Sequence, residues 1–476
     1  MESEVGESQK PKANYKVIPK EMLVPFIMVT SLFALWGIAN DITNPMVKAF
    51  QEVFLISSTQ SSLIQFAFYG GYATMAIPAA LFAQKYSYKA GILIGLALYA
   101  TGALLFIPAA STLNFMWFPI SLYILTFGLA FLETTANPYI LSMGPEETAT
   151  QRLNLAQAFN PIGSVVGMFV ASKLILGKLW VTQFRAEQMA AHPEYADLLP
   201  SEVNGKITAA LKEMQTSEAA THLQHQMADV EIIRNPYVAI GLIVIVVFVI
   251  FLFKKLPNTG TEGVEINPLA TAKRLFSNKR WVEGVIAQAF YVAAQICCWT
   301  YVIHYAMTNV NMSIDTAQNY NIAAMGIFLS SRFICTFLLK YISPGHMLMT
   351  LALGACALIT GTIFLQNING LYCLVGVSAC MSLMFPTIYG IALDGLGEDA
   401  KPGSAGLVFA IVGGALMPMA TGFIIDVETI TIGSITLTGV SASFVLPLIS
   451  FIVIAIFGYR TFTIHHAHSE EVFEEA

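Results

Sequence analysis

The sequence predicts an all-α membrane protein whose twelve transmembrane helices form two six-helix halves with pseudo-two-fold symmetry. Of its 476 residues, 56% are hydrophobic and only 11% are charged, whereas soluble domains carry roughly 25% charged residues. Twelve apolar segments have the length that a helix needs to cross a bilayer. Short sequence echoes between the two halves of the chain indicate an internal duplication.

Each expected span is an apolar run of bilayer length. The runs cover residues 22–50, 61–83, 91–110, 114–143, 152–177, 236–256, 281–307, 316–340, 346–366, 369–395, 402–426 and 438–463. The first run follows a basic stretch but lacks a small-residue cleavage site, so we expect it to be retained as a span. An even number of spans puts both termini on one side. The short loops of the other side hold almost no Lys or Arg apart from Lys48, and long loops escape the charge rule, so the positive-inside rule makes the side of the termini the cytoplasm.

Two longer hydrophilic segments divide the chain. Residues 178–235 form an expected outer loop with a helix-like run from Ser201 to Ile233, and residues 257–280 form a cytoplasmic linker. The expected domains are therefore a cytoplasmic tail (1–21), a first bundle that includes the outer loop (22–256), the linker (257–280), a second bundle (281–463) and a second cytoplasmic tail (464–476).

The evidence for duplication lies in motifs that recur in the same order at a nearly constant offset. Lys85-Tyr86 returns as Lys340-Tyr341, Leu96-Ala97-Leu98 returns as Leu351-Ala352-Leu353, and Gly163 corresponds to Gly413. Parallel repeats of this kind are typical of transporters that bind substrate near the bilayer midplane, between two halves that rock around it.

The fourth span contains a single charged residue, Glu133, between Phe115 and Met143. A carboxylate is costly in hydrocarbon, so it normally faces the bundle interior or a water-filled path. Asn137 shares a helix face with Glu133, and Pro138 cannot donate to the carbonyl of Thr134, which leaves that oxygen free to bond elsewhere. We expect Glu133 and Asn137 to belong to a transport site. The alternative is a structural carboxyl that bonds a neighbouring helix.

The fifth span carries amides and hydroxyls spaced three or four residues apart, at Asn154, Gln157, Asn160 and Ser164. These groups both donate and accept hydrogen bonds, as a polyhydroxylated ligand requires. We expect Gln157 and Asn160 to contact substrate, with interhelical hydrogen bonding as the alternative. Gly163 and Gly167 form a GxxxG motif that favours close helix packing.

The seventh span places two amides and two aromatic rings on one stripe. The stripe comprises Gln288, Tyr291, Gln295 and Trp299. Amides suit the hydroxyl edge of a sugar and rings suit its C–H face, although aromatic residues in membrane helices more often serve packing. Gln65 and Tyr69 in the second span and Tyr389 in the tenth are weaker candidates of the same kind.

The first span holds Asn40, Asp41, Asn44 and Lys48 within about two turns. Asp41 either carries a coupling ion or pairs with Lys48, and the two amides are candidate substrate ligands.

Two further charged residues lie in the second half. We expect Arg332 in the eighth span to pair with a carboxylate or with carbonyls, and Asp394 at the inner end of the tenth span to belong to a gate. The cysteines have no metal-ligand spacing and are expected to be small core residues. They are Cys297, Cys298, Cys335, Cys356, Cys373 and Cys380.

Five segments carry a specific resemblance that spans nearly the whole chain. They are residues 33–40 (FALWGIAN), 132–138 (LETTANP), 152–160 (RLNLAQAFN), 287–295 (AQAFYVAAQ) and 385–389 (FPTIY). The chain resembles the fucose–galactose–glucose symporter family of the major facilitator superfamily. The resemblance implies the major facilitator fold, a bacterial inner membrane location, and import of a monosaccharide with a cation by alternating access. L-fucose is the first expectation, with galactose or glucose as alternatives.

The resemblance also implies residue roles, with one departure. The family glutamate for sugar recognition and proton coupling falls on Glu133, and its helix-5 polar stripe falls on Gln157 and Asn160. A membrane aspartate that serves proton coupling in the family is replaced here by Asn44. Asp41 lies one turn earlier, where the family has an asparagine. Either the carboxylate has moved by a turn and kept its task, or the coupling ion is sodium.

Other functions fit the sequence less well. A drug/proton antiporter is disfavoured because the loop at 84–89 lacks a dense Gly-Asp-Arg-Arg motif, and a sugar sensor is disfavoured because the last tail is short. An enzyme is disfavoured because the spans offer no paired carboxylates, metal cluster or serine triad, and the few scattered basic residues exclude nucleic-acid binding. We expect a monomer in the lipid bilayer with a monosaccharide substrate, a co-transported proton or sodium ion, and no cofactor or metal.

Overall fold

The computed structural model describes residues 16–463 except for 57, 62, 198–199, 258–267, 311, 313, 426, 428 and 434. The expected terminal tails therefore lie mostly outside the described residues, as does much of the linker. Twelve of the described helices are long and apolar enough to cross a membrane, which confirms the predicted number of spans.

The six spans of the first half are built from nine helical segments. Their bounds are α1 (Leu23–Val53), α3 (Leu63–Lys85), α4 (Tyr88–Leu104) with α5 (Phe106–Thr112), α6 (Trp117–Leu141), α7 (Ala149–Gln157) with α8 (Phe159–Phe169) and the π-helical η3 (Val170–Ile175), and α11 (Ala219–Phe253).

The second half follows the same order of spans. Their bounds are α13 (Lys279–Thr300), α15 (Ile314–Leu338), α16 (Pro344–Leu365), α17 (Ile368–Met381) with α18 (Met384–Leu393), α19 (Ala400–Phe409) with η7 (Ala410–Val412) and α20 (Gly413–Ile425), and α21 (Gly439–Ser443) with α22 (Val445–Thr463).

Short elements connect the spans. They are η1 (Lys20–Met22), α2 (Ser58–Ser61), η2 (Glu146–Thr148), η4 (Leu176–Lys178), α9 (Trp180–Ala191), η5 (Pro193–Asp197), α10 (Pro200–Ser217), α12 (Pro268–Ser277), α14 (Val302–Val310), η6 (Gly397–Asp399) and the antiparallel pair β1 (Thr429–Ile432) and β2 (Ile435–Thr438).

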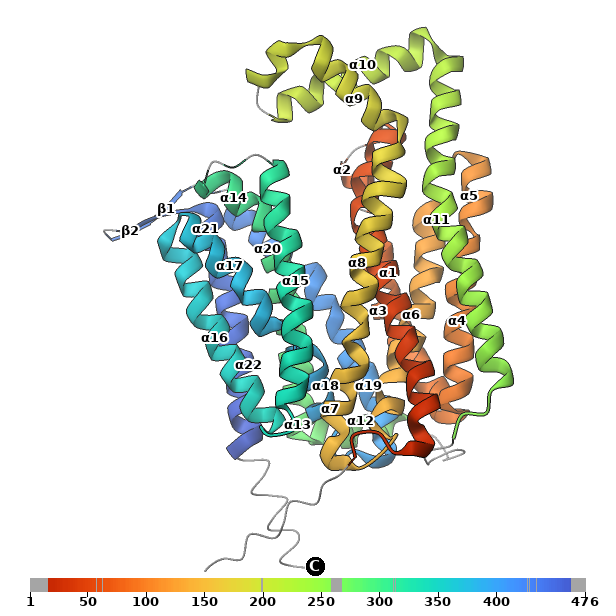
Figure 1. Ribbon diagram of the computed structural model, residues 1–476, viewed down its shortest axis with the longest axis vertical. Coiled ribbons are helices and arrows are strands. Elements are labelled where there is room, and N and C mark those ends of the chain that lie inside the picture. Colours follow the sequence, from red (N-terminus) through yellow and green to blue (C-terminus); the bar gives the residue numbers. More distant parts are fainter. Residues whose placement is uncertain are drawn as a thin grey trace, which may run out of the picture.

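The two halves lie side by side with their helices roughly parallel (Figure 1). We name the two ends of this bundle by what they carry. The linker end holds α12 and the start of α1, and the loop end holds α9 and α10.

The sequence echoes fall on equivalent helices of the two halves. In α8, a Cβ on Gly163 would lie 1.9 Å from the backbone oxygen of Ala34 in α1, and in α20 a Cβ on Gly413 would lie 2.3 Å from that of Ala289 in α13. In each half, therefore, a glycine lets the fifth span touch the backbone of the first. Close packing through the GxxxG motif is thus confirmed, since Gly167 likewise meets Ile38.

The loop end differs from the sequence-based expectation in one respect. The predicted run from Ser201 to Ile233 is two helices, because α10 ends at Ser217 and α11 begins at Ala219 and continues as the sixth span. Glu218 between them has non-helical dihedral angles. Apolar periodicity does not separate one long helix from two shorter ones joined at a single residue.

The helices α9 and α10 form a cap on the first half. The carboxylate of Asp229 in α11 accepts hydrogen bonds from the backbone N–H groups of Trp180 and Val181, which begin α9. Arg185 of α9 forms a 2.7 Å ion pair with Glu52 of α1. The cap is therefore fastened to both helices that carry it.

Candidate functional site

A cavity of about 190 Å³ lies between the two halves. Helices α1, α3, α6, α7 and α8 of the first half and α13, α15, α18 and η7 of the second half supply its walls. The lining residues are Phe33, Trp36, Asn40, Asp41, Phe68, Tyr69, Tyr72, Glu133, Gln157, Asn160, Pro161, Ser164, Tyr291, Val292, Gln295, Ile296, Trp299, Met325, Phe328, Arg332, Phe385 and Ile411.

Glu133 lines this cavity and is 8% exposed. Its neighbour Asn137 is fully buried one turn further along α6, where its side-chain N–H group donates to the backbone oxygen of Glu133 at 3.1 Å. The side-chain oxygen of Asn137 accepts a 2.8 Å hydrogen bond from Gln157. Asn137 therefore orients Gln157 from behind the cavity wall, and Glu133 and Gln157 reach the cavity itself.

The polar stripe of the fifth span faces the cavity where that span is broken. The span is divided at Ala158, between α7 and α8, and Gln157, Asn160 and Ser164 line the cavity around this position. The amide of Asn160 donates to the backbone oxygen of Phe33 at 3.3 Å. Its side-chain oxygen accepts no hydrogen bond from the part of the chain that the structure describes, so it can accept one from a ligand.

On α1, Asn40 and Asp41 both line the cavity. Ser164 of α8 lines the same part of the cavity as Asp41. The side chains of Asn44 and Lys48 lie outside the part of the chain that the structure describes, so the expected pairing of Asp41 with Lys48 stays a prediction.

The seventh-span stripe divides along its length. Gln295 and Trp299 line the cavity, as does Tyr291, whose hydroxyl donates to the backbone oxygen of Met381 at 3.0 Å. Gln288 lies further toward the linker end and is fully buried, and neither of its amide atoms has a hydrogen-bond partner among the described residues.

Arg332 of α15 is the basic residue of the cavity wall. Its guanidinium lies 5.0 Å from the ring centre of Phe328 and donates a long 3.5 Å hydrogen bond to the backbone oxygen of Gln157 in the other half. Its Nε has no partner, and no carboxylate of the described residues lies within ion-pair distance of it. Arg332 was expected to pair with a carboxylate or with carbonyls, and its partner in the structure is a carbonyl.

Three candidates lie away from the cavity. Gln65 is half-buried on α3, and Tyr389 is fully buried in α18. Asp394 lies just after α18 at the linker end, where it forms a 3.0 Å ion pair with Arg280 of α13.

Most hydrogen bonds between the halves gather toward the linker end. Ser404 of α19 donates to the backbone oxygen of Thr134 at 2.9 Å, and Asn154 of α7 donates to the hydroxyl of Thr387 in α18 at 3.2 Å. Nearby, the ammonium of Lys401 lies 4.5 Å from the ring centre of Tyr88. The described contacts thus close the linker end below the cavity.

Sequence reasoning expected Tyr69, Tyr291 and Trp299 at the cavity but missed Trp36 and Phe328. Trp36 donates through its indole N–H to the hydroxyl of Tyr72 at 3.0 Å, and both residues line the cavity. Phe328 and Trp299 meet edge to face at 5.0 Å on the opposite wall. One available signal was the position of Trp36, one helical turn before Asn40 and so on the same face of α1.

Comparisons with known proteins identify the family. Residues 27–185 match the Major Facilitator Superfamily. The chain is 52% identical to an L-fucose-proton symporter of Haemophilus influenzae, over 95% of this chain and 99% of that protein. It is 29% identical to a glucose/galactose transporter of Brucella abortus, over 90% of this chain and 92% of that protein.

A solved structure gives the same result. The crystal structure of the major facilitator transporter FucP in the outward conformation has a TM-score of 0.77 and 32% identity, and the match covers 93% of this chain and 99% of that one. The chain belongs to the fucose–galactose–glucose symporter family of the major facilitator superfamily.

Proposed function

We propose that the protein imports L-fucose together with protons by alternating access. The observation that carries this proposal is the inter-half cavity, where Glu133 lies among amides and aromatic rings. The 52% identity to an L-fucose-proton symporter supports both the sugar and the ion. On this proposal the protein is a transporter and not an enzyme.

The orientation of the chain follows from its basic residues. Lys85, Lys89, Lys254 and Arg460 all lie at or next to the linker ends of their helices, and the positive-inside rule puts such residues in the cytoplasm. The linker end is then cytoplasmic and the loop end is outside. We propose a multi-pass location in a bacterial inner membrane, with the protein acting as a monomer.

The residues of the cavity suit a monosaccharide. Gln157, Asn160 and Gln295 offer donors and acceptors for sugar hydroxyls, and Trp36 and Trp299 offer ring faces or edges for the less polar C–H surface. Ligand pockets commonly combine mostly apolar walls with a few fixed polar groups. An amide-rich wall also discriminates against ligands that would leave these buried groups unpaired.

Proton coupling is assigned to Glu133. Burial in the membrane disfavours its charged form, so a proton taken up from the outside removes this cost and prepares the cavity for sugar. The halves then rock, the contacts at the linker end separate, and water from the cytoplasm receives the sugar and the proton. Asp41 is the second candidate carboxylate, because it lines the same cavity.

Uptake by the purified protein in liposomes tests the proposal. Labelled L-fucose should accumulate when a pH gradient is imposed without sodium, and unlabelled L-fucose should compete better than D-galactose, D-glucose or N-acetylglucosamine. Accumulation with a sodium gradient alone would transfer the coupling role to sodium. Absence of any saturable sugar uptake under either gradient would overturn the transport proposal.

A further inference from the structure

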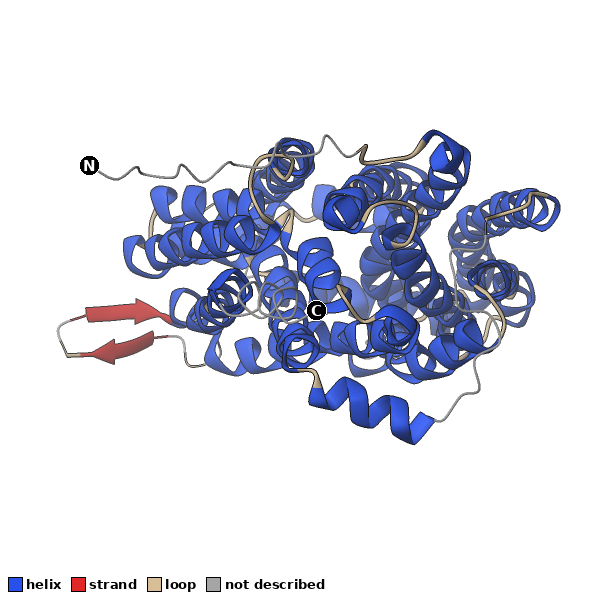
Figure 2. Cartoon of the chain, turned by 90° about the horizontal axis from the view of Figure 1, so that it is seen from below, coloured by secondary structure: helices blue, strands red, loops and turns tan. Residues whose placement is uncertain are grey.

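Helix α12 lies outside the membrane-spanning helices. It follows the linker and precedes α13, and the two views of the molecule place it at the linker end, on the edge of the bundle, with its axis across those of the spans (Figures 1 and 2). A short helix in this position lies at the level where the spans leave the hydrocarbon.

The outer face of α12 is apolar and basic. Leu269 is 83% exposed and Phe276 is 73% exposed, and their spacing of seven residues puts them on one face of the helix. Lys273 is exposed between them, while Thr271 and Leu275 on the opposite face are buried against the protein. Two large apolar side chains beside a lysine are typical of a helix that lies in a membrane interface.

Helix α12 is also fastened to α19, the helix that closes the linker end. Arg274 holds both carboxylate oxygens of Asp399, at the start of α19, through two hydrogen bonds of 2.7 Å. The ring of Phe276 meets that of Trp281 edge to face at 5.5 Å, and the indole N–H of Trp281 donates to the backbone oxygen of Gly403 in α19 at 2.9 Å. A movement of α12 would therefore be transmitted to α19 through these contacts.

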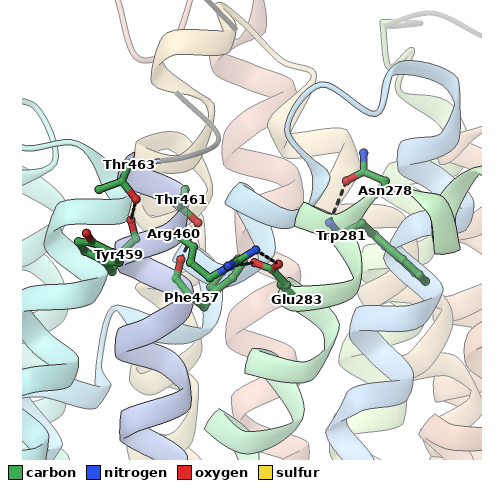
Figure 3. A network of polar contacts seen from close by, with 8 residues as sticks. All are labelled: Asn278, Trp281, Glu283, Phe457, Tyr459, Arg460, Thr461 and Thr463. Atoms are coloured by element: carbon green, nitrogen blue, oxygen red, sulfur yellow. Dashed lines mark hydrogen bonds and ion pairs between the residues drawn. The ribbon is translucent and has the colours of Figure 1, made fainter. Parts of the chain in front are cut away.

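The start of α13, which lies between α12 and α19, is held in place by contacts of its own. The side chain of Asn278 accepts a 3.0 Å hydrogen bond from the backbone N–H of Trp281 and so caps α13, and Glu283 pairs with Arg460 of α22 at 2.8 Å (Figure 3). Trp281 is thus held by its backbone and by its indole, between the outer helix α12 and the closing helix α19.

We propose that α12 binds the anionic headgroups of membrane phospholipids through Lys273, with Leu269 and Phe276 inserted at the edge of the acyl chains. The ion pair of Arg274 with Asp399 then couples the position of the lipid-bound α12 to that of α19. The lipid contact stands independently of the transported substrate. Its effect on closure rests on the proposed alternating access, because α19 carries the contacts that must separate when the linker end opens.

A phospholipid surface fits this face better than a soluble partner does. The exposed pair of Leu269 and Phe276 is narrow, and it lies at the edge of the helical bundle. Lys254, Lys255 and Lys279 are exposed near the same end of the helices, so the anionic surface of a membrane complements the charge of this end. Each lysine near such a surface contributes about fivefold in binding.

Amide hydrogen exchange of the full-length protein in nanodiscs tests the lipid contact without any sugar. Exchange of the peptide at 268–277 is compared in discs of phosphatidylcholine and in discs that contain phosphatidylglycerol. We expect exchange to slow by about fivefold in the anionic discs, and this slowing to be lost in Lys273→Gln and in the double variant Leu269→Ser/Phe276→Ser. Lys212→Gln, on α10 at the loop end, is the matched control and should behave like the unaltered protein.

The outcomes separate the parts of the proposal. Equal exchange of α12 in both kinds of disc would overturn headgroup binding, and slowing that appears only when soluble cell extract is added would assign the face to a protein. Arg274→Gln should keep the slowing at α12 but lose the lipid-dependent change in exchange at 397–405. A lipid-dependent change there that survives in Arg274→Gln would overturn transmission through Arg274.

Discussion

The hydroxyl of Ser404 in α19 lies 2.9 Å from the backbone oxygen of Thr134 in α6 and donates a hydrogen bond to it across the two halves. Thr134 has this oxygen available because Pro138, four residues later, lacks the N–H group that would otherwise bond it. The proline in the helix of Glu133 therefore creates an acceptor, and the other half of the protein uses it when the linker end is closed. The same hydroxyl is also 2.6 Å from the backbone oxygen of Lys401, so its proton is shared.

Replacement of Ser404 should weaken closure of the linker end. Ser404→Ala removes a buried donor and is expected to shift the equilibrium between closed and open states by about 0.5–1.5 kcal/mol toward the open state. Faster amide exchange at 400–409 would measure this shift. The control is Ser443→Ala, because Ser443 is buried and, within the described residues, its hydroxyl bonds Val440 of its own helix and nothing in the other half. Equal exchange in Ser404→Ala and the unaltered protein would show that the inter-half bond contributes nothing to closure.

Neutralisation of Glu133 should separate sugar exchange from proton-driven accumulation. Glu133→Gln keeps the shape of the side chain but cannot release a proton. We expect it to retain exchange of internal for external sugar in liposomes while accumulation under a pH gradient falls by at least about tenfold, which corresponds to ~1.4 kcal/mol of lost coupling. Glu146→Gln, at an exposed glutamate of the linker end, is the control. If Glu133→Gln still took up protons with sugar at the normal proton-to-sugar ratio, proton coupling would belong to another residue, with Asp41 as the next candidate.

Asn137 should influence sugar affinity although it lies behind the cavity wall. Its side-chain oxygen accepts the 2.8 Å hydrogen bond from Gln157, so Asn137→Ala frees Gln157 to rotate. We expect Asn137→Ala and Gln157→Ala each to weaken sugar binding. The double variant should be little worse than either, with a coupling energy of about 1 kcal/mol by calorimetry. Fully additive effects would mean that the two side chains act on the sugar independently.

Arg332 should affect the conformational change of the empty protein more than that of the sugar-bound protein. Among the described residues, its buried guanidinium contacts the ring of Phe328 and donates one long hydrogen bond to Gln157, while its Nε has no partner, and a charge without an ion-pair partner in a membrane protein is costly. Deprotonated Glu133 or a bound sugar can supply the missing partner as the halves close around the site. We expect Arg332→Gln to slow net uptake by about tenfold or more while exchange is affected less, and Arg332→Lys to restore part of the net rate. Equal losses of exchange and of net uptake would instead assign Arg332 to sugar binding.

Gly163 should tolerate no side chain. A Cβ at this position would lie 1.9 Å from the backbone oxygen of Ala34, so Gly163→Ala must separate α8 from α1, and such overpacking costs roughly 1–3 kcal/mol. We expect a lower Tm in detergent for Gly163→Ala. Gly326→Ala, where no packed neighbour of the described residues lies within 4 Å of the added atom, should leave Tm unchanged or raise it, because alanine favours helix. An unchanged Tm in Gly163→Ala would argue against this close packing.

The sequence predicts more of the fold than of the candidate site. Span number and the repeat follow from apolar length and local echoes, and Glu133, Gln157 and Gln295 stand out because polar groups are rare in spans. The position of a polar residue along the helix axis, relative to the cavity, is harder to predict. Gln288 and Gln295 share a helix face, but seven residues separate them by about 10 Å along the axis, so one reaches the cavity and the other is buried toward the linker end.

The aromatic wall illustrates a second limit. Trp36 and Phe328 line the cavity, yet in a membrane helix the same residue types fill ordinary packing positions. The inter-half contacts of Ser404 and Asn154 depend on the tilt and rotation of the halves, which no local pattern specifies.

The cap formed by α9 and α10 is a suitable binding site for an antibody fragment. Asp229 and the ion pair of Arg185 with Glu52 fasten it to α11 and α1, away from the cavity residues. An antibody fragment raised against α9 and α10 would add mass to the first half, to which the cap is fastened. It would serve as a fiducial for electron cryo-microscopy of this small membrane protein, and its angle to the second half would report each stage of the transport cycle.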